Sequence, residues 1–161
     1  MKDIYFIKDR LLELIPESEA EVIEAKAGKP WIQVNPQTWA ETAKFLRDDS
    51  ELRFNTLMCL SGLHYPDHEL LGVAYHLHST ENGLQTAIKV LIAESDTEIP
   101  SVEKIWKTAD WHEREAYDMF GIRFKNHPNM SRILCPDDWE GYPLRKDYVP
   151  QTSYMGITTE N

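Results

Sequence analysis

The dipeptide Asn82-Gly83 lies between two stretches of alternating apolar residues, and it is the strongest hairpin signal in the chain. Asn-Gly favours the left-handed backbone of a two-residue loop. That loop places six apolar side chains on one face of a strand pair, in the register Leu77–Ile88, Tyr75–Val90 and Val73–Ile92. We therefore expect an antiparallel sheet with one buried face, and His76 and His78 on the other face.

The segments around this hairpin predict further helices and strands. Apolar residues at helical spacing from Ile4 to Ile15 predict a helix that Pro16 ends. Asn35 followed by Pro36 is typical of a helix start, and this helix fades near residues 48–49. The expected strands are 21–27 at an edge, 31–34, 54–64, 70–79 and the one after Asn82-Gly83.

Two short helices are expected after the meander. Ser101 predicts the start of a helix that reaches Trp106. Asp110 and Glu113 have the spacing of a capping box for a second helix, which Gly121 closes. The order is helix, two strands, helix, three strands, two helices. It predicts an α+β fold, with residues 1–121 as a two-layer domain whose helices pack mainly on one sheet face, and residues 122–161 as an extended Pro-rich tail.

Composition limits the classes of function. The chain has 161 residues, 42% hydrophobic residues and a net charge of −10, which suits one domain plus an appendage. The acidic excess lies in residues 1–120 and disfavours nucleic acid and anionic lipid, whereas residues 121–161 are balanced. The chain has neither a signal-peptide pattern nor an apolar run of about 20 residues, so we expect a soluble, cytoplasmic protein without direct membrane insertion.

Motifs for independent catalysis are absent from the sequence. It has no GxGxxG, Walker A or GxSxG pattern, and His112-Glu113 lacks the second histidine of HExxH. Cys59 and Cys135 have no CxxC spacing, and Cys59 falls in a strand expected to be buried. A metal held by four histidines (His64, His68, His76, His78) is the alternative to solvated sheet-surface histidines, which we favour. Residues 137–140 are interpreted as a turn, although their carboxylates could form a catalytic pair.

The tail carries prolines at intervals of seven or eight residues. Pro128, Pro136, Pro143 and Pro150 block helices and central strands, which leaves extended segments separated by turns. Such a segment with aromatic and charged side chains is typical of a docking arm that is mobile in the free chain. We also expect charged residues of the last helix to form a network that locks the tail to the body, namely Glu113, Arg114 and Asp118.

Two sequence blocks in the same order resemble a known family. EREAYDMFGIRFKNHP, followed by RIL and DDWEGYPLRKDY, resembles the 30-kilodalton subunit, also called the C subunit, of respiratory NADH:quinone oxidoreductase (complex I). The resemblance is dense over residues 106–150 and looser upstream. Tyr142 stands where the family commonly has His, and Ser131 where a basic residue often precedes Arg132.

The resemblance implies a non-catalytic core subunit of the peripheral arm, scaffolding the quinone-site large subunit and lying near the terminal-cluster subunit. It implies a peripheral location on the cytoplasmic side of the bacterial inner membrane. The parent complex would use NADH, FMN, iron–sulfur clusters and quinone, none of them bound by this chain. The expected partner-interface residues are Glu113, Arg114, Asp118, Phe120, His127, Pro128, Arg132, Trp139, Tyr142, Pro143, Leu144, Arg145, Lys146, Asp147 and Tyr148. The Arg145 side chain is expected to project away from its local backbone, and the domain core is not expected to depend on it.

Two alternatives remain open from the sequence. The first is the equivalent subunit of a related membrane-bound hydrogenase of the formate hydrogenlyase type. The second is a free-standing small enzyme that uses groups near His127 and Asp137.

Overall fold

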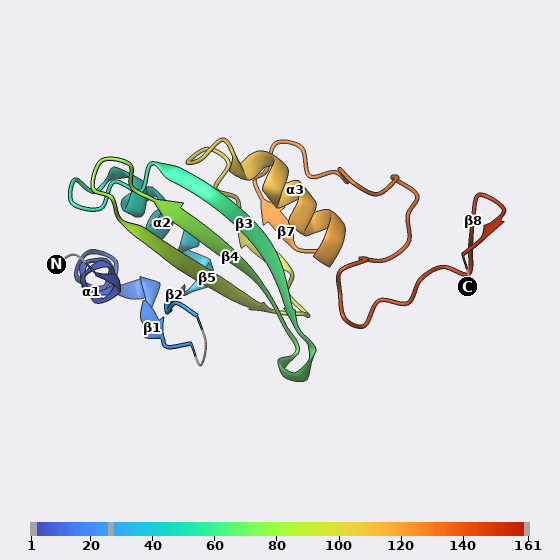
Figure 1. Cartoon of the computed structure of the whole chain (residues 1–161), viewed down its shortest axis with the longest axis horizontal. Helices are drawn as coiled ribbons and strands as arrows, with labels where there is room; N and C mark the ends of the chain where they lie inside the picture. Colours follow the sequence, from blue (N-terminus) through green and yellow to red (C-terminus); the bar gives the residue numbers. More distant parts are fainter. Residues whose placement is uncertain (1–2, 26–27, 160–161) are drawn as a thin grey trace.

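The computed structural model describes residues 3–25 and 28–159, and it has the α+β architecture that the sequence predicts. The main sheet is five-stranded in the order β1-β2-β5-β4-β3. Figure 1 shows the curved strands of this sheet, helix α3 beside β3, and a long irregular segment that leaves the body beyond α3.

The helices and strands lie close to their expected positions. The α-helices are α1 (Ile4–Leu14), α2 (Trp39–Asp48) and α3 (Ala109–Phe120). The sheet strands are β1 (Glu21–Ile23), β2 (Trp31–Val34), β3 (Thr56–Tyr65), β4 (Leu70–His78) and β5 (Gln85–Ala93). Short pairs are formed by β6 (Glu98–Pro100) with β7 (Arg123–Lys125) and by β8 (Ser153–Tyr154) with β9 (Ile157–Thr158). Of the expected strand 21–27, residues 26–27 lie outside the described residues.

The hairpin forms, but its expected register is wrong by two residues. Tyr75 pairs with Ile88, and Val73 pairs with Val90. The Ser79 N–H donates to the Leu84 carbonyl (2.9 Å), so the loop holds four residues instead of two. Because side chains alternate with a period of two, a shift of two residues keeps the same side chains on the buried face.

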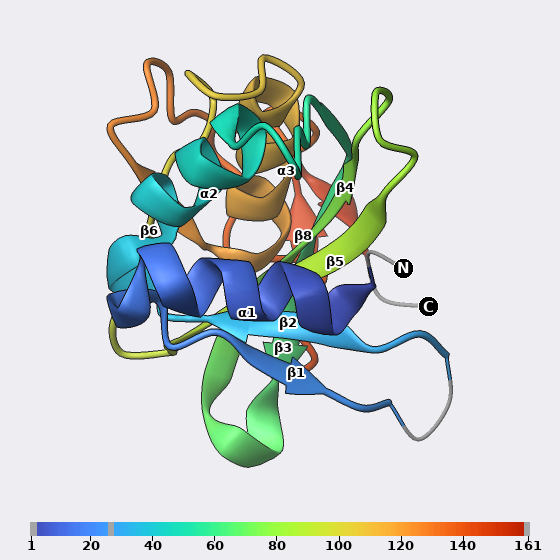
Figure 2. The same cartoon turned by 90° about the vertical axis from the view of Figure 1, so that its left-hand side faces the viewer.

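One face of the sheet carries the core. Along β5 every second side chain is buried, and the helices contribute their apolar stripes to the same core. Trp39 of α2 is fully buried and its ring lies 4.4 Å from that of Tyr75 on β4. Figure 2 shows α1 lying across β2, which joins the sheet parallel to β5. The expected edge position of β1 is confirmed.

The opposite face remains partly open to solvent. His76 on this face is exposed, as expected, and His78 is half-buried. Cys59 was expected to be buried, but it is exposed, because it shares the open face with His76. A pocket of about 660 Å³ lies at one end of this face, between Ile4 and Ala87.

The region before α3 differs from the sequence prediction. Residues 101–106 form turns instead of a helix, so one helix follows the meander where two were expected. The expected capping box is also wrong, because α3 begins after Thr108 without a side-chain cap. Gly121 ends α3 in the left-handed conformation (φ 78°), as expected. Ile122 and Phe124 lie in the core, so the packed body continues to the end of β7.

Candidate functional site

The junction between α3 and the segment 126–159, hereafter the tail, is organised around the carboxylate of Asp118. This side chain is fully buried near the end of α3. Its Oδ2 accepts backbone N–H groups of Ile133 (3.0 Å), Leu134 (2.7 Å) and Cys135 (2.8 Å), and its Oδ1 accepts from Arg132 (2.6 Å). Burial raises the pKa of Asp118, but these four donors outweigh burial and hold the pKa below its ordinary value.

Arg132 gathers the tail around this carboxylate. Besides its ion pair with Asp118, it donates to the carbonyls of Trp139 (2.9 Å) and Gly141 (3.0 Å). Its side chain is only 13% exposed. A guanidinium has five N–H donors in a fixed plane, so one side chain can join a helix and two points of an irregular segment.

The last carbonyls of α3 all find donors, and three of the four donors belong to the tail. Gly121 N–H donates to the Tyr117 carbonyl, and Arg132 donates to that of Asp118 (3.2 Å). The Leu144 N–H donates to Met119 (3.0 Å), and Arg145 Nε donates to Phe120 (2.6 Å). The last four carbonyls of a helix have no partner within the helix, so the tail supplies what the helix lacks. The two guanidinium groups also face the negative end of the helix dipole.

Arg145, which the sequence assigned to a partner, thus binds the end of a helix in its own chain. The end of a helix offers free carbonyls, and Leu144, the residue before Arg145, already lies against this end. We call the contacts of Asp118, Arg132 and Arg145 with α3 and the tail the clasp. The expected network between α3 and the tail is confirmed for Arg114 as well, which donates to the carbonyls of Ser131 (3.2 Å) and Arg132 (2.9 Å).

Tyr142 packs in the middle of the clasp. The guanidinium carbons of Arg132 and Arg145 lie 5.5 and 5.1 Å from its ring centre, within cation–π range. The ring of Tyr117 meets it edge-on at 6.4 Å. A Cβ at position 121 would come within 2.6 Å of the Tyr142 ring, so Gly121 serves both the helix end and this close packing.

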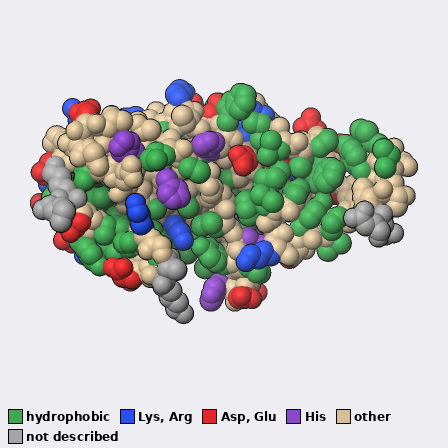
Figure 3. Space-filling view, viewed as in Figure 1, with side chains coloured by type: hydrophobic (Ala, Val, Ile, Leu, Met, Phe, Trp, Pro, Cys, Tyr) green, Lys and Arg blue, Asp and Glu red, His purple; other side chains and the backbone are tan. Residues whose placement is uncertain are grey.

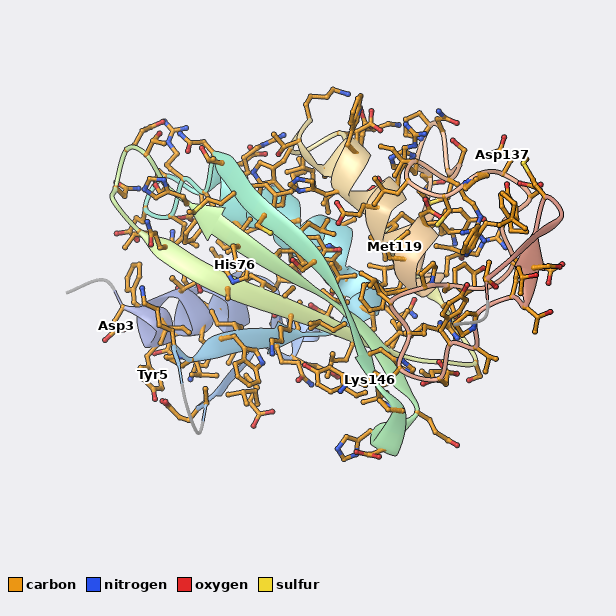
Figure 4. The ribbon with its side chains drawn as sticks, turned by 45° about the vertical axis from the view of Figure 1, so that its right-hand side comes forward. Asp3, Tyr5, His76, Met119, Asp137 and Lys146 are labelled. Carbon is orange, nitrogen blue, oxygen red and sulfur yellow. The ribbon has the colours of Figure 1, made fainter. Side chains whose placement is uncertain are left out.

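His64 at the end of β3 is a contact that the sequence interpretation missed. It is buried, not solvated as expected, because it lies on the core face in alternation with Leu60. Its Nε2 lies 2.7 Å from Glu94 Oε1, and its Nδ1 accepts the Lys146 N–H (3.0 Å). Figure 4 shows Lys146 beside β3 and β4, and Asp137 on the far side of α3 from the sheet. Side chains two residues apart share a strand face, so the position of His64 four residues after the apolar Leu60 was the signal that could have predicted this burial.

Glu113 ties α3 to the turn before it, and is not part of a cap. Its fully buried carboxylate accepts the Ser101 hydroxyl (2.6 Å) and the Val102 N–H (2.8 Å). Burial raises the pKa of Glu113 to about 7, although these two donors act in the opposite direction. His127, with no exposed side-chain area, brings its Nε2 to the Asp110 carbonyl (3.1 Å).

The other expected interface residues fall into two groups. Four are exposed in the structure, namely Pro128, Leu144, Lys146 and Asp147. Four are half-buried against the chain itself, namely Phe120, Trp139, Pro143 and Tyr148. The Trp139 ring, for example, lies 5.2 Å from that of Tyr154.

Large apolar side chains of the tail remain exposed while its polar groups bind the body. Their exposed fractions range from 55% for Leu144 to 81% for Val149, and the set also includes Leu134, Met155 and Ile157. Trp111 on α3 is 68% exposed. Figure 3 shows hydrophobic side chains gathered over the α3 and tail end of the molecule. A monomeric protein rarely exposes this many apolar side chains close together, so this arrangement is typical of a binding surface.

The alternative of a free-standing enzyme depended on groups near His127 and Asp137. His127 has no exposed side-chain area and Asp137 is exposed, so the two do not form one solvent-accessible pair. Among residues 3–25 and 28–159, no group of three His, Cys, Asp or Glu side chains is placed to hold a metal ion. Over the same residues, no helix is long and apolar enough to cross a membrane.

Comparison with known proteins gives consistent matches. The family model described as respiratory-chain NADH dehydrogenase, 30 Kd subunit, matches residues 32–154. The C subunit of NADH-quinone oxidoreductase from Chlorobium phaeobacteroides is 50% identical over 80% of this chain and 78% of its own length. The same subunit from Chloroherpeton thalassium is 53% identical over 76% of this chain and 51% of its own length.

Solved structures show the same fold. The trypsin-resistant fragment (1–134) of Nqo5 has a TM-score of 0.65 and 27% identity, covering 76% of this chain and 98% of the fragment. A chain of an archaeal membrane-bound sulfane sulfur reductase has a TM-score of 0.73 and 23% identity, covering 90% of this chain and 85% of its own. The sequence and family matches together show that this chain belongs to the family of the 30 kDa subunit of respiratory-chain NADH dehydrogenase.

Proposed function

We propose that this chain is a non-catalytic core subunit of the peripheral arm of a proton-pumping NADH:quinone oxidoreductase. Its role is to scaffold the quinone-site large subunit, next to the subunit that holds the terminal cluster. The whole complex transfers electrons from NADH to quinone with FMN and iron–sulfur clusters, and this chain binds none of these groups. The proposed location is peripheral, on the cytoplasmic side of the bacterial inner membrane.

The observation that carries this proposal is that the polar groups of the tail bind the body while its apolar side chains stay exposed. Backbone groups and arginines of the tail are engaged with α3, whereas Leu144 and Val149 point apolar surface at solvent. A segment held in place before binding loses less conformational entropy when a partner covers it. Each large apolar side chain covered by a partner adds on the order of 1.5–3 kcal/mol to the gross binding free energy.

The expected interface residues then have two different roles. Leu144, Lys146 and Asp147 face the partner, because their side chains are exposed. Asp118, Arg132 and Arg145 hold the tail in its binding conformation and do not themselves reach the partner.

Co-purification with the quinone-site subunit tests the proposal. Leu144→Asp places a charge in the proposed interface, so we expect recovery of the complex to fall at least about tenfold. Leu14→Asp on α1 is the matched control, because Leu14 is 50% exposed and Leu144 is 55% exposed. Equal recovery of the two variants would remove Leu144 from the interface and contradict the proposal.

A further inference from the structure

Two buried histidines hold the tail through the same ring nitrogen. His64 on β3 and His127 at the start of the tail have exposed side-chain fractions of 1% and 0%. The Nδ1 of His64 accepts the Lys146 N–H (3.0 Å), and the Nδ1 of His127 accepts the Asn129 N–H (3.0 Å). A ring nitrogen that accepts a hydrogen bond carries no proton, so both rings are neutral in this arrangement.

The other ring nitrogen must therefore carry the proton in both residues. His64 Nε2–H donates to Glu94 Oε1 (2.7 Å), beyond the end of β5. His127 Nε2–H donates to the Asp110 carbonyl (3.1 Å) on α3. Each ring thus joins an N–H of the tail to an oxygen of the body, and each uses its full hydrogen-bonding capacity as a neutral group.

We infer that His64 and His127 form a proton-operated latch, which holds the backbone N–H groups of Lys146 and Asn129 while the rings are neutral and releases these two N–H groups when the rings are protonated. Protonation places a second N–H on Nδ1, and this N–H then faces the N–H of Lys146 or Asn129. Two donors cannot share a hydrogen bond, so the bond from the Lys146 or Asn129 N–H is lost on protonation. This inference concerns the chain alone and does not rest on the proposed function.

Charged groups lie around both rings. His64 faces Glu94 from the body, and Asp147 Oδ1 of the tail lies 3.8 Å from its Nδ1. His127 faces Asp110 Oδ1 (3.3 Å) and Glu113 Oε2 (3.9 Å), both on α3 and both on the side of Nε2. These carboxylates stabilise an imidazolium but cannot restore the acceptor for Asn129.

At His64 the exposed Asp147 carboxylate lies nearest to the new N–H. Protonation there would exchange the bond to the Lys146 backbone for an ion pair to the Asp147 side chain. The backbone of the tail would therefore be released at residue 146 while the side chain beside it is retained.

Nitrogen-15 NMR of the full chain between pH 8 and pH 5.5 tests the latch. At pH 8 both rings should show the tautomer with the proton on Nε2. On acidification, the exchange protection of the Lys146 and Asn129 amides, corrected for the intrinsic pH dependence, should fall at least about tenfold as the rings protonate. The Leu144 amide, which donates to the Met119 carbonyl, is the internal control, and its exchange protection should fall less than that of Lys146 and Asn129.

Two variants separate the latch from a merely structural role. His64→Asn places an oxygen acceptor that does not titrate near the position of Nδ1, so the Lys146 amide should stay protected at both pH values. His64→Phe removes the acceptor, so that amide should be unprotected at both. An Nδ1–H tautomer at pH 8 would overturn the inference, as would rings that stay neutral at pH 5.5 or protection that survives their protonation. If the Phe variant does not fold, the wild-type titration and the Asn variant still decide.

Discussion

The sheet body and the tail of this chain are held by different forces. In the body, apolar side chains such as Trp39 and Ile88 are fully buried between helices and sheet. In the tail, backbone N–H and carbonyl groups are bound to Asp118 and Arg132, whereas Val149 remains exposed. Burial of apolar area stabilises many arrangements of similar volume, but hydrogen bonds to a fixed carboxylate specify one path of the backbone.

This difference explains how a segment without apolar periodicity can keep a defined shape. A tail that buried its apolar side chains in its own body would leave nothing for a partner to cover. A tail held through its backbone keeps those side chains available. Stability and recognition therefore use different atoms of the same residues, as at Leu134, whose N–H binds Asp118 while its side chain is 64% exposed.

The body should respond most strongly to loss of a core side chain. Trp39→Ala removes a fully buried ring that packs on Tyr75, and we expect a loss of about 3–5 kcal/mol in the free energy of unfolding. Urea unfolding followed by circular dichroism measures it. Trp111→Ala, at a 68% exposed position, is the control and should cost less than about 1 kcal/mol. Similar losses in both variants would mean that the core assignment is wrong.

Breaking the clasp should release the tail while the body stays folded. Arg132→Ala leaves the buried Asp118 carboxylate without its ion-pair partner, and such losses cost about 3–5 kcal/mol. We expect amide protection to disappear across residues 131–145 and the far-UV spectrum to change little. Arg123→Ala, an exposed arginine on β7, is the control. Retained protection in the Arg132 variant would show that the clasp does not depend on this pair.

The buried carboxylates of Glu113 and Asp118 should give opposite pH dependences. For Glu113 the folded pKa of about 7 exceeds the ordinary 4.5, so the folded chain binds more protons in this window and stability falls as pH rises through it. Glu113→Gln removes this penalty. From pH 4.5 to pH 8, the free energy of unfolding of the variant should therefore rise by up to about 3 kcal/mol relative to that of the wild type. Chemical unfolding at the two pH values measures the gain, with the exposed Glu115→Gln as control. A difference in the free energy of unfolding between variant and wild type that is the same at both pH values would contradict the prediction.

For Asp118 the folded pKa is lowered, so the sign reverses. Its contribution to stability is present above its unfolded pKa and is lost as pH falls through the folded value. Asp118→Asn should therefore lower the exchange protection of the tail amides at pH 7. The difference in protection between variant and wild type should narrow in strong acid. Amide exchange of Cys135, corrected for the intrinsic dependence of exchange on pH, measures this difference.

The smallest effect is expected at Arg145. Arg145→Ala removes one charge-assisted hydrogen bond to the Phe120 carbonyl and the contact with the Tyr142 ring. We expect a local loss of about 1–2 kcal/mol, seen as faster exchange of the Leu144 amide, with little change in the melting temperature of the body. Lys146→Ala, with an exposed side chain, is the control. A large fall in the melting temperature would make Arg145 part of the body.

The sequence predicted most of the body because its signals are periodic. The buried face of β4 and β5 was predicted even though the loop length was wrong, because alternation survives an even shift in register. Turns at residues 101–106 were mistaken for a helix, because a capping serine also starts isolated turns and Ser101 here binds Glu113.

The clasp could be predicted only in part. Charges on α3 suggested a lock on the tail, and Arg114 and Asp118 fulfil it. The tail residues that bind Asp118 do so through backbone N–H groups, which are the same in every residue except proline and leave no sequence signal. Arg145 was assigned to a partner because nothing in its neighbours along the chain indicates that the end of α3 lies beside it.

The central claim is that the tail is clasped to α3 in the free chain and is not a mobile arm that orders only on a partner. Hydrogen exchange of the Ile133, Leu134 and Cys135 amides in the purified full-length chain at pH 7 tests this claim most directly. We predict protection of roughly a hundredfold or more over an unstructured peptide, lost in the Arg132→Ala variant. Exchange at the rate of an unstructured peptide in the wild-type chain would contradict the account.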